Sequence, residues 1–347
     1  MKKILAAMSG GVDSAATAIL LKNQGYFAAG GTMCLRCGAE AEIADAQRSC
    51  QQLELPFYRF DLQEEFDRIV VDAFQAEYRA GRTPNPCIVC NEKMKFGLFL
   101  DKALELGFDG IATGHYARVE EQNGRFLLKT AADLSRDQSY FLYRLSQAQL
   151  SRTLFPLGAY TKDEARALCR ETGLHLSAKK DSQDICFVPD GDYMAVLKAR
   201  GLAPQMGDFI LNGVRVAPHE GLEAYTIGQR RGLGYAAGER VYVTGKQGTD
   251  VLLGENSELF STIVYVENLN YIAFDAPTGP FEAECKLRSG PRRSLCTVTP
   301  TEKGATLTFR EPQRAVTPGQ SAVFYDGDTV LGGGVIVGCE RQSHENE

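Results

Sequence analysis

The stretch "KKILAAMSGGVDSAATAILLKNQG", residues 2–25, joins an apolar run to a helical pattern through a glycine turn. The run at 2–8 predicts a short buried strand, and the segment from residue 14 predicts a helix that ends at Gly25. Between them, Gly10 and Gly11 allow the backbone to direct its N–H groups toward an anion, and the positive end of the helix points to the same place. This order predicts either a phosphate-binding turn or a tight turn before a capped helix.

The side chains of this turn suit a nucleotide. Ser9 and Ser14 bring hydroxyl groups, and Asp13 offers a carboxylate to a magnesium ion. The chain lacks a Gly-Lys-Ser/Thr sequence here, which would grip β and γ phosphates. The turn is therefore not predicted to transfer a terminal phosphate.

The first half of the chain continues to alternate between strand and helix patterns. Strands are predicted at 26–33 and 108–114, and helices at 41–55 and 62–78, with "FYRF" (57–60) between the two helices. This alternation predicts an α/β fold with a doubly wound parallel sheet. Ligands collect at the carboxyl ends of such strands, so we expect "SGGVDS" (9–14), "MCLRC" (33–37) and "TGHYAR" (113–118) along one edge.

The pattern changes after the first half, which predicts three domains. Residues 1–190 form the α/β domain. Residues 191–258 are glycine-rich and predict a small connector domain of strands and turns. Residues 259–347 contain short β-rich runs separated by Pro, Gly and Asn, which predict a small barrel or sandwich; of these we expect a C-terminal β-barrel.

Composition limits the class of protein. No run of about 18 apolar residues predicts a membrane span, and the apolar stretch near the N-terminus is too short for a secretory signal. We therefore expect a cytoplasmic protein, whose ten cysteines serve as metal ligands, catalytic groups or buried thiols. The net charge of −6 argues against indiscriminate binding to nucleic acid, but local basic patches would still allow an RNA partner.

The cysteine pair in "TPNPCIVCN", residues 83–91, allows several chemistries. Cys87 and Cys90 have the spacing of zinc ligands, iron–sulfur ligands, a redox pair or a nucleophile, and the spacing alone does not decide. The second pair, Cys34 and Cys37, would complete a four-thiolate zinc site if folding united the two pairs. The remaining cysteines other than Cys186 are expected to be packed thiols: Cys50, Cys169, Cys285, Cys296 and Cys339.

The "SGGVDS" turn resembles the signature of the ATP pyrophosphatase (PP-loop) family. Those enzymes cleave ATP between the α and β phosphates and activate an oxygen as its adenylate. Further ordered blocks, spanning residues 8–336 together with the turn, resemble bacterial tRNA-specific 2-thiouridylases of the MnmA type. They are "TPNPCIVCNEKMKF" (83–96), "ATGHYAR" (112–118), "RDQSYFLYRL" (136–145), "DSQDICFV" (181–188), "TIGQRRGLG" (226–234) and "AVTPGQSAVFYDGDTVLGGGVI" (315–336).

The resemblance implies an ATP-dependent tRNA uridine 2-sulfurtransferase that makes 2-thiouridine at the wobble position of Lys, Glu and Gln tRNAs. It implies that Cys186 carries a persulfide and that Cys90 is its partner. Cys87 departs from one branch of the family, which has an aspartate there. Alternatively, Cys87, Cys90 and Cys186 are three ligands of a [4Fe-4S] cluster whose open iron binds hydrosulfide.

The resemblance also implies which residues meet each substrate. His115 and the segment Asn85, Pro86 and Cys87 would contact the flipped-out base. Arg136, Asp137 and Gln138 would contact the anticodon loop, and Arg288 and Gln320 would face the tRNA from the C-terminal domain. ATP with Mg2+ would be held by Ala7, Met8, Ser9, Gly10, Gly11, Val12, Asp13, Ser14, Met33 and Gly114.

The expected partners are tRNA and a persulfide sulfur donor, such as a cysteine desulfurase or a sulfur-carrier protein. Two other functions stay open. One is a PP-loop ligase that forms a C–N bond on an adenylated carbonyl, and the other is a non-catalytic RNA-binding or iron–sulfur sensing protein of the same fold.

Overall fold

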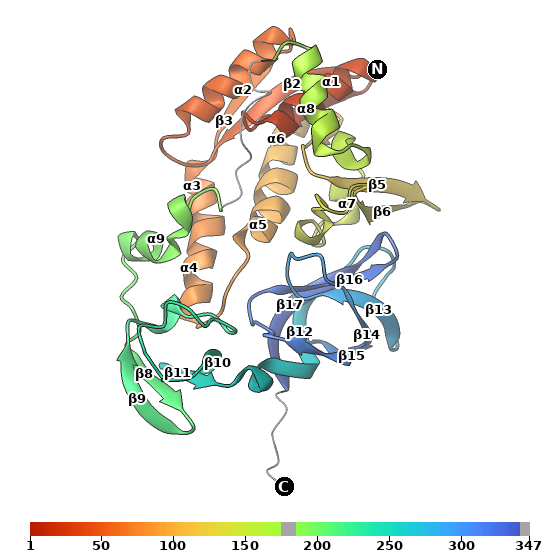
Figure 1. Ribbon diagram of the computed structural model, residues 1–347. Helices are drawn as coiled ribbons and strands as arrows, with labels where there is room; N and C mark the ends of the chain where they lie inside the picture. Colours follow the sequence, from red (N-terminus) through yellow and green to blue (C-terminus); the bar gives the residue numbers. More distant parts are fainter. Residues whose placement is uncertain (175–184, 341–347) are drawn as a thin grey trace.

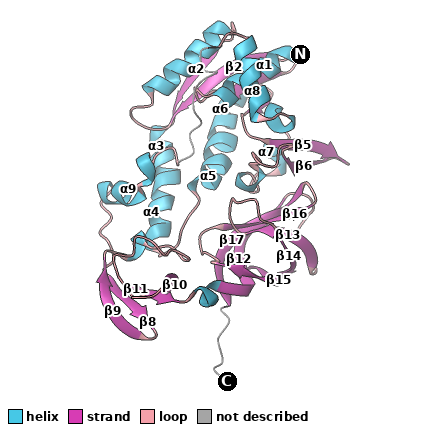
Figure 2. Cartoon of the chain, in the orientation of Figure 1, coloured by secondary structure: helices cyan, strands magenta, loops and turns pink. Residues whose placement is uncertain are grey.

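The computed structural model describes residues 1–174 and 185–340 (Figure 1). An α/β part occupies the top of the view, and two β-rich parts lie below it. Figure 2 shows the same division by secondary structure, with cyan helices concentrated in the upper half and magenta strands in the lower half. None of the helices within the described residues is long and apolar enough to cross a membrane.

The upper part contains the predicted parallel sheet. Its five strands have the order β3-β2-β1-β4-β7, and every neighbouring pair is parallel. This order confirms the predicted α/β fold. The strands are β1 (Lys3–Ala7), β2 (Phe27–Cys34), β3 (Phe57–Asp61), β4 (Gly110–Ala112) and β7 (Thr153–Leu154).

Helices cover both faces of this sheet because alternate residues of each strand point to opposite sides. On β1, Ile4 and Ala6 belong to a core shared with α1 (Val12–Asn23), α2 (Glu40–Gln52) and α8 (Lys162–Glu171). Leu5 belongs to the core on the opposite face. That second core includes residues of η2 (Cys90–Phe99) and α6 (Leu100–Glu105).

Two long helical segments run below the sheet and pack against each other. The first is continuous through α3 (Gln63–Phe66), η1 (Asp67–Val71) and α4 (Asp72–Arg79), and it corresponds to the amphipathic helix predicted at 62–78. The second is continuous through α5 (Pro86–Val89), η2 and α6. Both η1 and η2 are π-helical, which the periodicity did not predict, and π-helical turns often occur at functional sites.

The connector and the barrel complete the chain. The connector has a four-stranded sheet of order β10-β11-β8-β9, and strands β12 to β17 form a closed antiparallel barrel because β12 pairs with both β15 and β17. The closed barrel confirms the prediction for the C-terminal part. The strands are β8 (Gly207–Leu211), β9 (Val214–His219), β10 (Tyr242–Gln247), β11 (Asp250–Gly254), β12 (Phe260–Tyr271), β13 (Phe281–Lys286), β14 (Ser294–Pro300), β15 (Gly304–Arg314), β16 (Ser321–Asp326) and β17 (Thr329–Glu340).

A hairpin links the first half of the chain to the barrel. Strands β5 (Ala117–Gln122) and β6 (Arg125–Thr130) pair around Asn123 and Gly124, both at positive φ as a tight hairpin turn requires. Lys129 of β6 then pairs with Thr329 of β17. Short elements complete the chain: η3 (Ser139–Phe141), α7 (Gln147–Leu150), η4 (Pro156–Ala159), η6 (Pro189–Gly191), α9 (Tyr193–Ala199), η7 (Leu222–Ala224) and η8 (Asn256–Leu259).

Candidate active site

The glycine turn after β1 is held tightly against neighbouring elements. Gly10 has φ +69°, and a Cβ there would lie 2.3 Å from the Glu42 carbonyl oxygen of α2, so only glycine fits. Ser14 is buried, donates its hydroxyl to the Gly11 carbonyl at 2.9 Å and accepts the Ser9 N–H at 3.2 Å. The turn is therefore compact, with Ser9 exposed above the start of α1.

The residues on either side of the turn are fixed by the sheet and the helix. Met8 is buried; its N–H donates to Gly31 at 2.8 Å, and its carbonyl accepts the Thr32 hydroxyl at 2.6 Å. Val12 is buried at the start of α1, and Ala7 ends β1 partly exposed. These two therefore position the turn through packing.

Asp13 is the charged residue of the turn, and the fold supplies it with two partners. Lys162 of α8 lies 2.8 and 2.9 Å from its carboxylate oxygens, and the Tyr116 hydroxyl donates to it at 2.8 Å. The Lys162 side chain is 9 % exposed and that of Asp13 is 34 % exposed. Neither partner was predicted from the sequence. Tyr116 lies within "ATGHYAR", but Lys162 is so far from Asp13 along the chain that no local pattern indicates the pair.

The loop after β4 lies directly against this turn. A Cβ at Gly114 would be 2.9 Å from Asp13, so glycine is required for contact between the two loops. His115 follows; its Nδ1 is 2.7 Å from the Thr113 hydroxyl, and Phe96 and Phe155 flank its ring.

The environment of His115 keeps its ring neutral. Burial lowers the pKa of His115 well below its usual value, and the positive charge of Lys95 lowers it further. A neutral imidazole can donate one hydrogen bond and accept another, but it does not bring a positive charge to a phosphate. His115 is therefore suited to bind a polar ligand group rather than to act as an acid.

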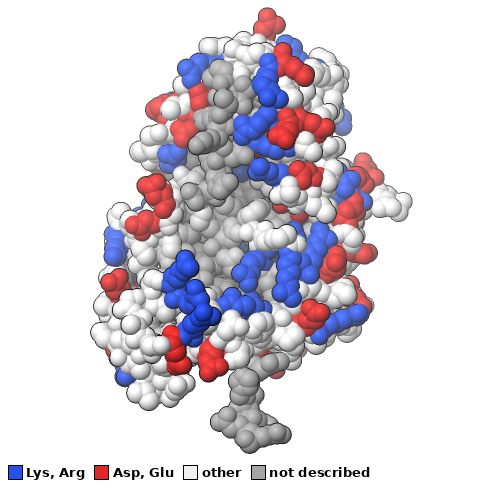
Figure 3. Space-filling view, viewed as in Figure 1, with Lys and Arg blue, Asp and Glu red and all other residues white. Residues whose placement is uncertain are grey.

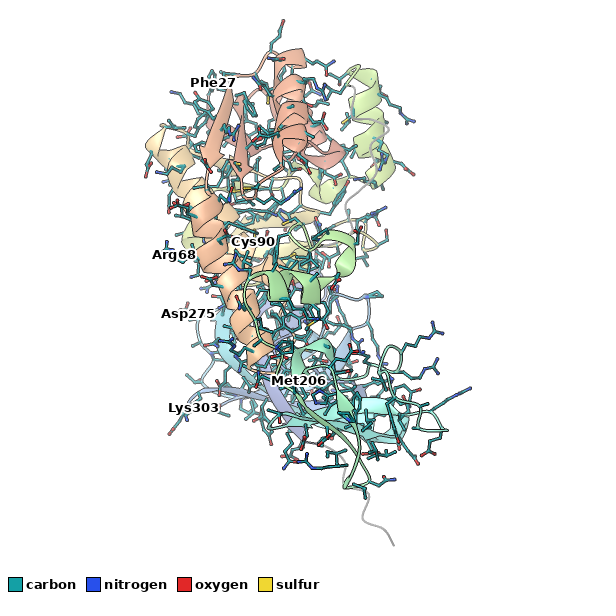
Figure 4. The ribbon with its side chains drawn as sticks, turned by 90° about the vertical axis from the view of Figure 1, so that its left-hand side faces the viewer. Phe27, Arg68, Cys90, Met206, Asp275 and Lys303 are labelled. Carbon is teal, nitrogen blue, oxygen red and sulfur yellow. The ribbon has the colours of Figure 1, made fainter. Side chains whose placement is uncertain are left out.

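The cysteine pair lies on the second helical segment. Asn85 is extended, and Pro86 begins α5, where its missing N–H costs no helical hydrogen bond. Cys87 and Cys90 are three residues apart on this helix and therefore share a face. Figure 4 shows Cys90 at mid-height in the molecule, between Phe27 of the sheet above and Met206 below.

The π-helical geometry brings Lys95 to the same face. In a π-helix each N–H bonds to the carbonyl five residues earlier, so residues five apart lie one turn apart. Cys90 and Lys95 have this spacing within η2. Lys95 lowers the pKa of Cys87, Cys90 and Cys186, which locates its charge near all three thiols.

Burial has the larger effect on these thiols. It raises the pKa of Cys90 to about 12 and also raises the pKa of Cys87 and Cys186. A negative charge on Cys186 raises the pKa of both other thiols, so the three lie within range of mutual electrostatic interaction. The site therefore holds protonated thiols at neutral pH, next to one lysine that favours ionisation.

The neighbouring residue, Phe187, anchors Cys186 to the first helical segment. Phe187 packs edge-on against Phe66 and Phe74 of the first helical segment, with ring centroids 5.6 and 5.2 Å apart. Cys186 remains accessible to solvent, although the protein around it desolvates its thiol enough to raise its pKa, whereas Cys90 is buried. The first four residues of "DSQDICFV" lie outside the described residues. Met33, at the end of β2, packs partly buried against the core cluster that contains Cys90.

The arrangement of the cysteines decides whether they can hold a metal ion together. Three thiolates suit iron–sulfur chemistry, but across residues 1–174 and 185–340 no three His, Cys, Asp or Glu side chains are arranged to hold a metal ion. The hypothesis of a four-thiolate zinc site is therefore wrong for this arrangement. Cys34 is buried beside the Arg59 guanidinium, and Cys37 is exposed beside Gln63.

Four other cysteines are packed thiols, as expected. Cys50, Cys169, Cys285 and Cys296 are buried, and burial raises the pKa of Cys169 to about 11. Cys50 lies under β2, where a Cβ at Gly30 would be 2.2 Å from its sulfur. Cys339 is partly exposed on β17.

The segment 136–138 departs from its expected role in one respect. The Asp137 side chain is only 2 % exposed and pairs with Lys286 of β13 at 3.2 Å. It also accepts hydrogen bonds from the N–H and hydroxyl groups of Ser139. In this arrangement the Asp137 carboxylate bonds to the protein and does not present itself to RNA.

The two neighbours of Asp137 differ from it. Gln138 accepts the Tyr116 N–H at 3.0 Å, and its own N–H donates to the Tyr116 carbonyl at 2.9 Å. Because Tyr116 also bonds to Asp13, this segment is connected to the glycine turn. Arg136 is exposed.

The two barrel residues expected to face tRNA lie at its surface. Arg288 is exposed and donates to the Arg314 carbonyl at 3.0 Å. Gln320 is partly buried, and its amide donates to the Thr83 carbonyl at 2.8 Å. Figure 3 shows Lys and Arg side chains gathered on the lower middle of the visible face, over the connector and the barrel. Two arginine-containing runs, "GQRRGLG" (228–234) and "KLRSGPRRS" (286–294), supply the exposed arginines Arg230, Arg231, Arg288 and Arg292.

Comparison with known proteins covers nearly the whole chain. Three family models match in order: a tRNA methyl transferase HUP domain at residues 2–190, a tRNA methyl transferase PRC-barrel domain at 198–251 and an aminomethyltransferase β-barrel domain at 261–336. The [4Fe-4S] U34-tRNA thiolase NcsA of Methanococcus maripaludis matches 53 % of this chain and 60 % of its own, at 17 % identity and a TM-score of 0.37, too low to add to the assignment.

Two relatives are more informative. The tRNA-specific 2-thiouridylase MnmA 2 of Clostridium botulinum is 43 % identical, covering 96 % of this chain and 99 % of the relative. The tRNA-specific 2-thiouridylase MnmA of Clostridium acetobutylicum is 42 % identical with the same coverage. Together with the parallel sheet, the glycine turn and the closed barrel, this similarity shows that the chain belongs to the tRNA-specific 2-thiouridylase (MnmA) family.

Proposed function

We propose that the protein is an ATP-dependent tRNA uridine 2-sulfurtransferase that forms 2-thiouridine at the wobble position of Lys, Glu and Gln tRNAs. The observation that carries this proposal is the near full-length similarity to 2-thiouridylases. It is supported by what lies at the carboxyl end of β2. The glycine turn adjoins this end because the Met8 carbonyl accepts the Thr32 hydroxyl, and the cysteine helix adjoins it because Met33 packs against the core cluster that contains Cys90.

The nucleotide half of the reaction would use the turn at 9–14. ATP is a substrate here: the uridine O2 attacks its α phosphate, pyrophosphate leaves and the base becomes an adenylate. The N–H groups at the start of α1, together with Lys162, would bind phosphate oxygens. Mg2+ commonly uses one or two carboxylates plus phosphate oxygens. Asp13 fits that role if it shares its charge with Lys162.

The sulfur half would use Cys186 and Cys90. The terminal sulfur of a persulfide on Cys186 attacks C2 of the adenylated base, and AMP leaves. The Cys90 thiolate then attacks the Cys186 sulfur and breaks the persulfide S–S bond, which leaves the sulfur on the base and a disulfide between the two cysteines. An external thiol must reduce that disulfide before the next cycle. Lys95 would favour the thiolate that this step requires.

The alternative is a [4Fe-4S] cluster on Cys87, Cys90 and Cys186. The thiols have the right chemistry, but no three His, Cys, Asp or Glu side chains in the described part of the chain form a metal centre as arranged here. No step above therefore depends on a cluster. Iron and acid-labile sulfide, counted in protein purified anaerobically, distinguish the two routes.

The base and the tRNA would meet different parts of the chain. Asn85, Pro86, Cys87 and His115 would surround the flipped-out base, and a persulfide donor such as a cysteine desulfurase or a sulfur-carrier protein would reach the exposed Cys186. Arg136, Gln138 and Arg288 would face the tRNA, whereas the Asp137 side chain is buried and Gln320 donates its amide to the Thr83 carbonyl. The division into domains 1–190, 191–258 and 259–347 and a cytoplasmic location are part of the same proposal.

One experiment separates the proposed function from its alternatives. Purified protein is given ATP, tRNA transcripts and a persulfide donor, and both pyrophosphate exchange and 2-thiouridine are measured. We expect exchange that depends on tRNA, and one 2-thiouridine for each AMP released. Exchange that needs no tRNA would indicate a C–N ligase, and tRNA binding without exchange would indicate a non-catalytic protein.

A further inference from the structure

The loop before the cysteine helix, residues 81–85, is held by two other parts of the chain. The Thr83 N–H donates to the Pro318 carbonyl at 2.9 Å, and the Thr83 carbonyl accepts the Gln320 amide at 2.8 Å. Both bonds come from the turn between β15 and β16 of the barrel. The Thr83 hydroxyl lies 3.3 Å from that of Thr226 in the connector. Both backbone polar groups of one loop residue are thus satisfied by the barrel.

The barrel turn fits closely against this loop. Gly319 has φ +92°, and a Cβ there would lie 3.0 Å from the Thr83 backbone and from Arg82 Cβ. The turn is fixed to the barrel as well, because the Gly319 N–H donates to the Ile336 carbonyl at 2.9 Å and the Ile336 N–H donates to the Gln320 carbonyl at 2.8 Å. Its position is therefore set by β17 and transmitted to Thr83.

The chain between Thr83 and the cysteines is short and stiff. Pro84 and Pro86 have fixed φ angles, and Pro86 begins the helix that carries Cys87 and Cys90. A movement of Thr83 should therefore move Cys87 as well, because few backbone angles between the two residues are free to compensate for it. The first helical segment constrains the other side of the loop, since Arg82 forms a two-bond ion pair with Glu77 at 2.6 and 2.7 Å.

We propose that Gln320 is a positioning residue for sulfur transfer: its amide fixes Thr83 and thereby the helix that presents Cys87 and Cys90. This inference rests on the proposed function, and it changes the role of Gln320 from a tRNA contact to a connection between the tRNA-binding barrel and the cysteines. A tRNA that shifts the barrel turn would shift the cysteine helix with it.

The structure favours this role over direct contact with RNA. The Gln320 amide donates to the Thr83 carbonyl, and the backbone carbonyl of the same residue accepts the Ile336 N–H. Arg288, which is exposed and donates to the Arg314 carbonyl within the barrel, provides the contrasting case.

The test compares Gln320→Glu and Gln320→Ala with Arg288→Ala. The glutamate variant keeps the shape but loses the N–H donor. The first measurement is the alkylation rate of Cys90 without tRNA, followed by mass spectrometry. Loss of one hydrogen bond should open the loop about fivefold more often, so both Gln320 variants should be alkylated about fivefold faster, and Arg288→Ala should match wild type.

The second measurement is steady-state 2-thiouridine formation. We expect the Gln320 variants to lower kcat with an unchanged KM for tRNA, and Arg288→Ala to raise KM with an unchanged kcat. Thr226→Val removes the contact between Thr83 and the connector. It should likewise speed alkylation of Cys90 and lower kcat, so it tests the inference even where the Gln320 variants fold poorly. A raised KM with unchanged alkylation would overturn the inference. Failure of the proposed function would appear separately, as full activity in Cys90→Ser.

Discussion

The Lys162 ammonium lies 2.8 and 2.9 Å from the two carboxylate oxygens of Asp13, joining residues 149 positions apart. Asp13 belongs to the glycine turn and Lys162 to the first turn of α8. The same pair of charges can bind a metal–phosphate group, since the carboxylate attracts the metal and the ammonium attracts the phosphate.

Replacing Asp13 with Asn should abolish pyrophosphate exchange and leave tRNA affinity intact. Loss of the Asp13 carboxylate beside Lys162 should lower the free energy of unfolding by about 1–3 kcal/mol. The loss is modest because Asp13 is partly solvated. The double variant Asp13→Asn with Lys162→Met should recover stability without activity. Urea unfolding and filter binding of tRNA measure the two effects. Lost tRNA affinity with retained AMP formation would contradict this prediction.

Stability should fall in acid through His115. The pKa of His115 is lowered in the folded protein by burial and by Lys95, so below its unfolded pKa of about 6.5 the unfolded state binds the extra proton. Above about pH 6.5 His115 is neutral in both states and stability is unaffected. The free energy of unfolding then falls as the pH decreases toward the folded pKa. His115→Gln should show a shallower decline of Tm between pH 7 and 5. Parallel declines would remove His115 from this explanation.

Lys95→Met should slow alkylation of Cys90 at pH 8. Its ammonium lowers the pKa of all three site thiols, so removing it raises those pKa values and reduces the thiolate fraction. Lys95→Arg keeps the charge and should keep most of the rate. The measurement is the pH dependence of alkylation, cysteine by cysteine. An unchanged profile in Lys95→Met would show that burial alone controls these thiols.

The cysteine variants separate the two routes of sulfur delivery. Cys90→Ser and Cys186→Ser should each eliminate 2-thiouridine formation under all conditions. Cys87→Asp should be partly active with a persulfide donor in air, because only Cys90 and Cys186 transfer sulfur. It should be poorly active with free sulfide under anaerobic conditions, because a carboxylate weakens iron binding. The readout is 2-thiouridine per enzyme, with bound iron counted in parallel.

Binding of tRNA should weaken steeply with salt despite the net charge of −6. Arginines on the connector and the barrel would neutralise phosphates and release counterions. Arg288→Ala should reduce the slope of log affinity against log salt concentration by about 1. A flat profile for the wild-type protein would exclude these arginines as phosphate contacts.

Much of the fold could be predicted because local patterns report local structure. Apolar runs of the right length predicted β1, β2 and β4, and Gly25 and Gly81 marked the ends of two helices, where both adopt positive φ. The π-helical turns could not be predicted, since their hydrogen bonds shift by one residue without any change in composition. The hairpin at 117–130 was missed, although its Asn-Gly turn was a signal.

The sequence by itself determined the α/β class and the β-rich C-terminal part, because these depend on residue type and spacing within a segment, and its resemblance to a known family supplied the candidate residues for the chemistry. Only the tertiary structure decided which of these residues meet. Lys162 pairs with Asp13, the charge of Lys95 lowers the pKa of Cys186 in another segment, and Gln320 bonds to Thr83. Such contacts join distant segments, and their energies depend on burial and on distances of a few ångströms, which residue order does not encode locally.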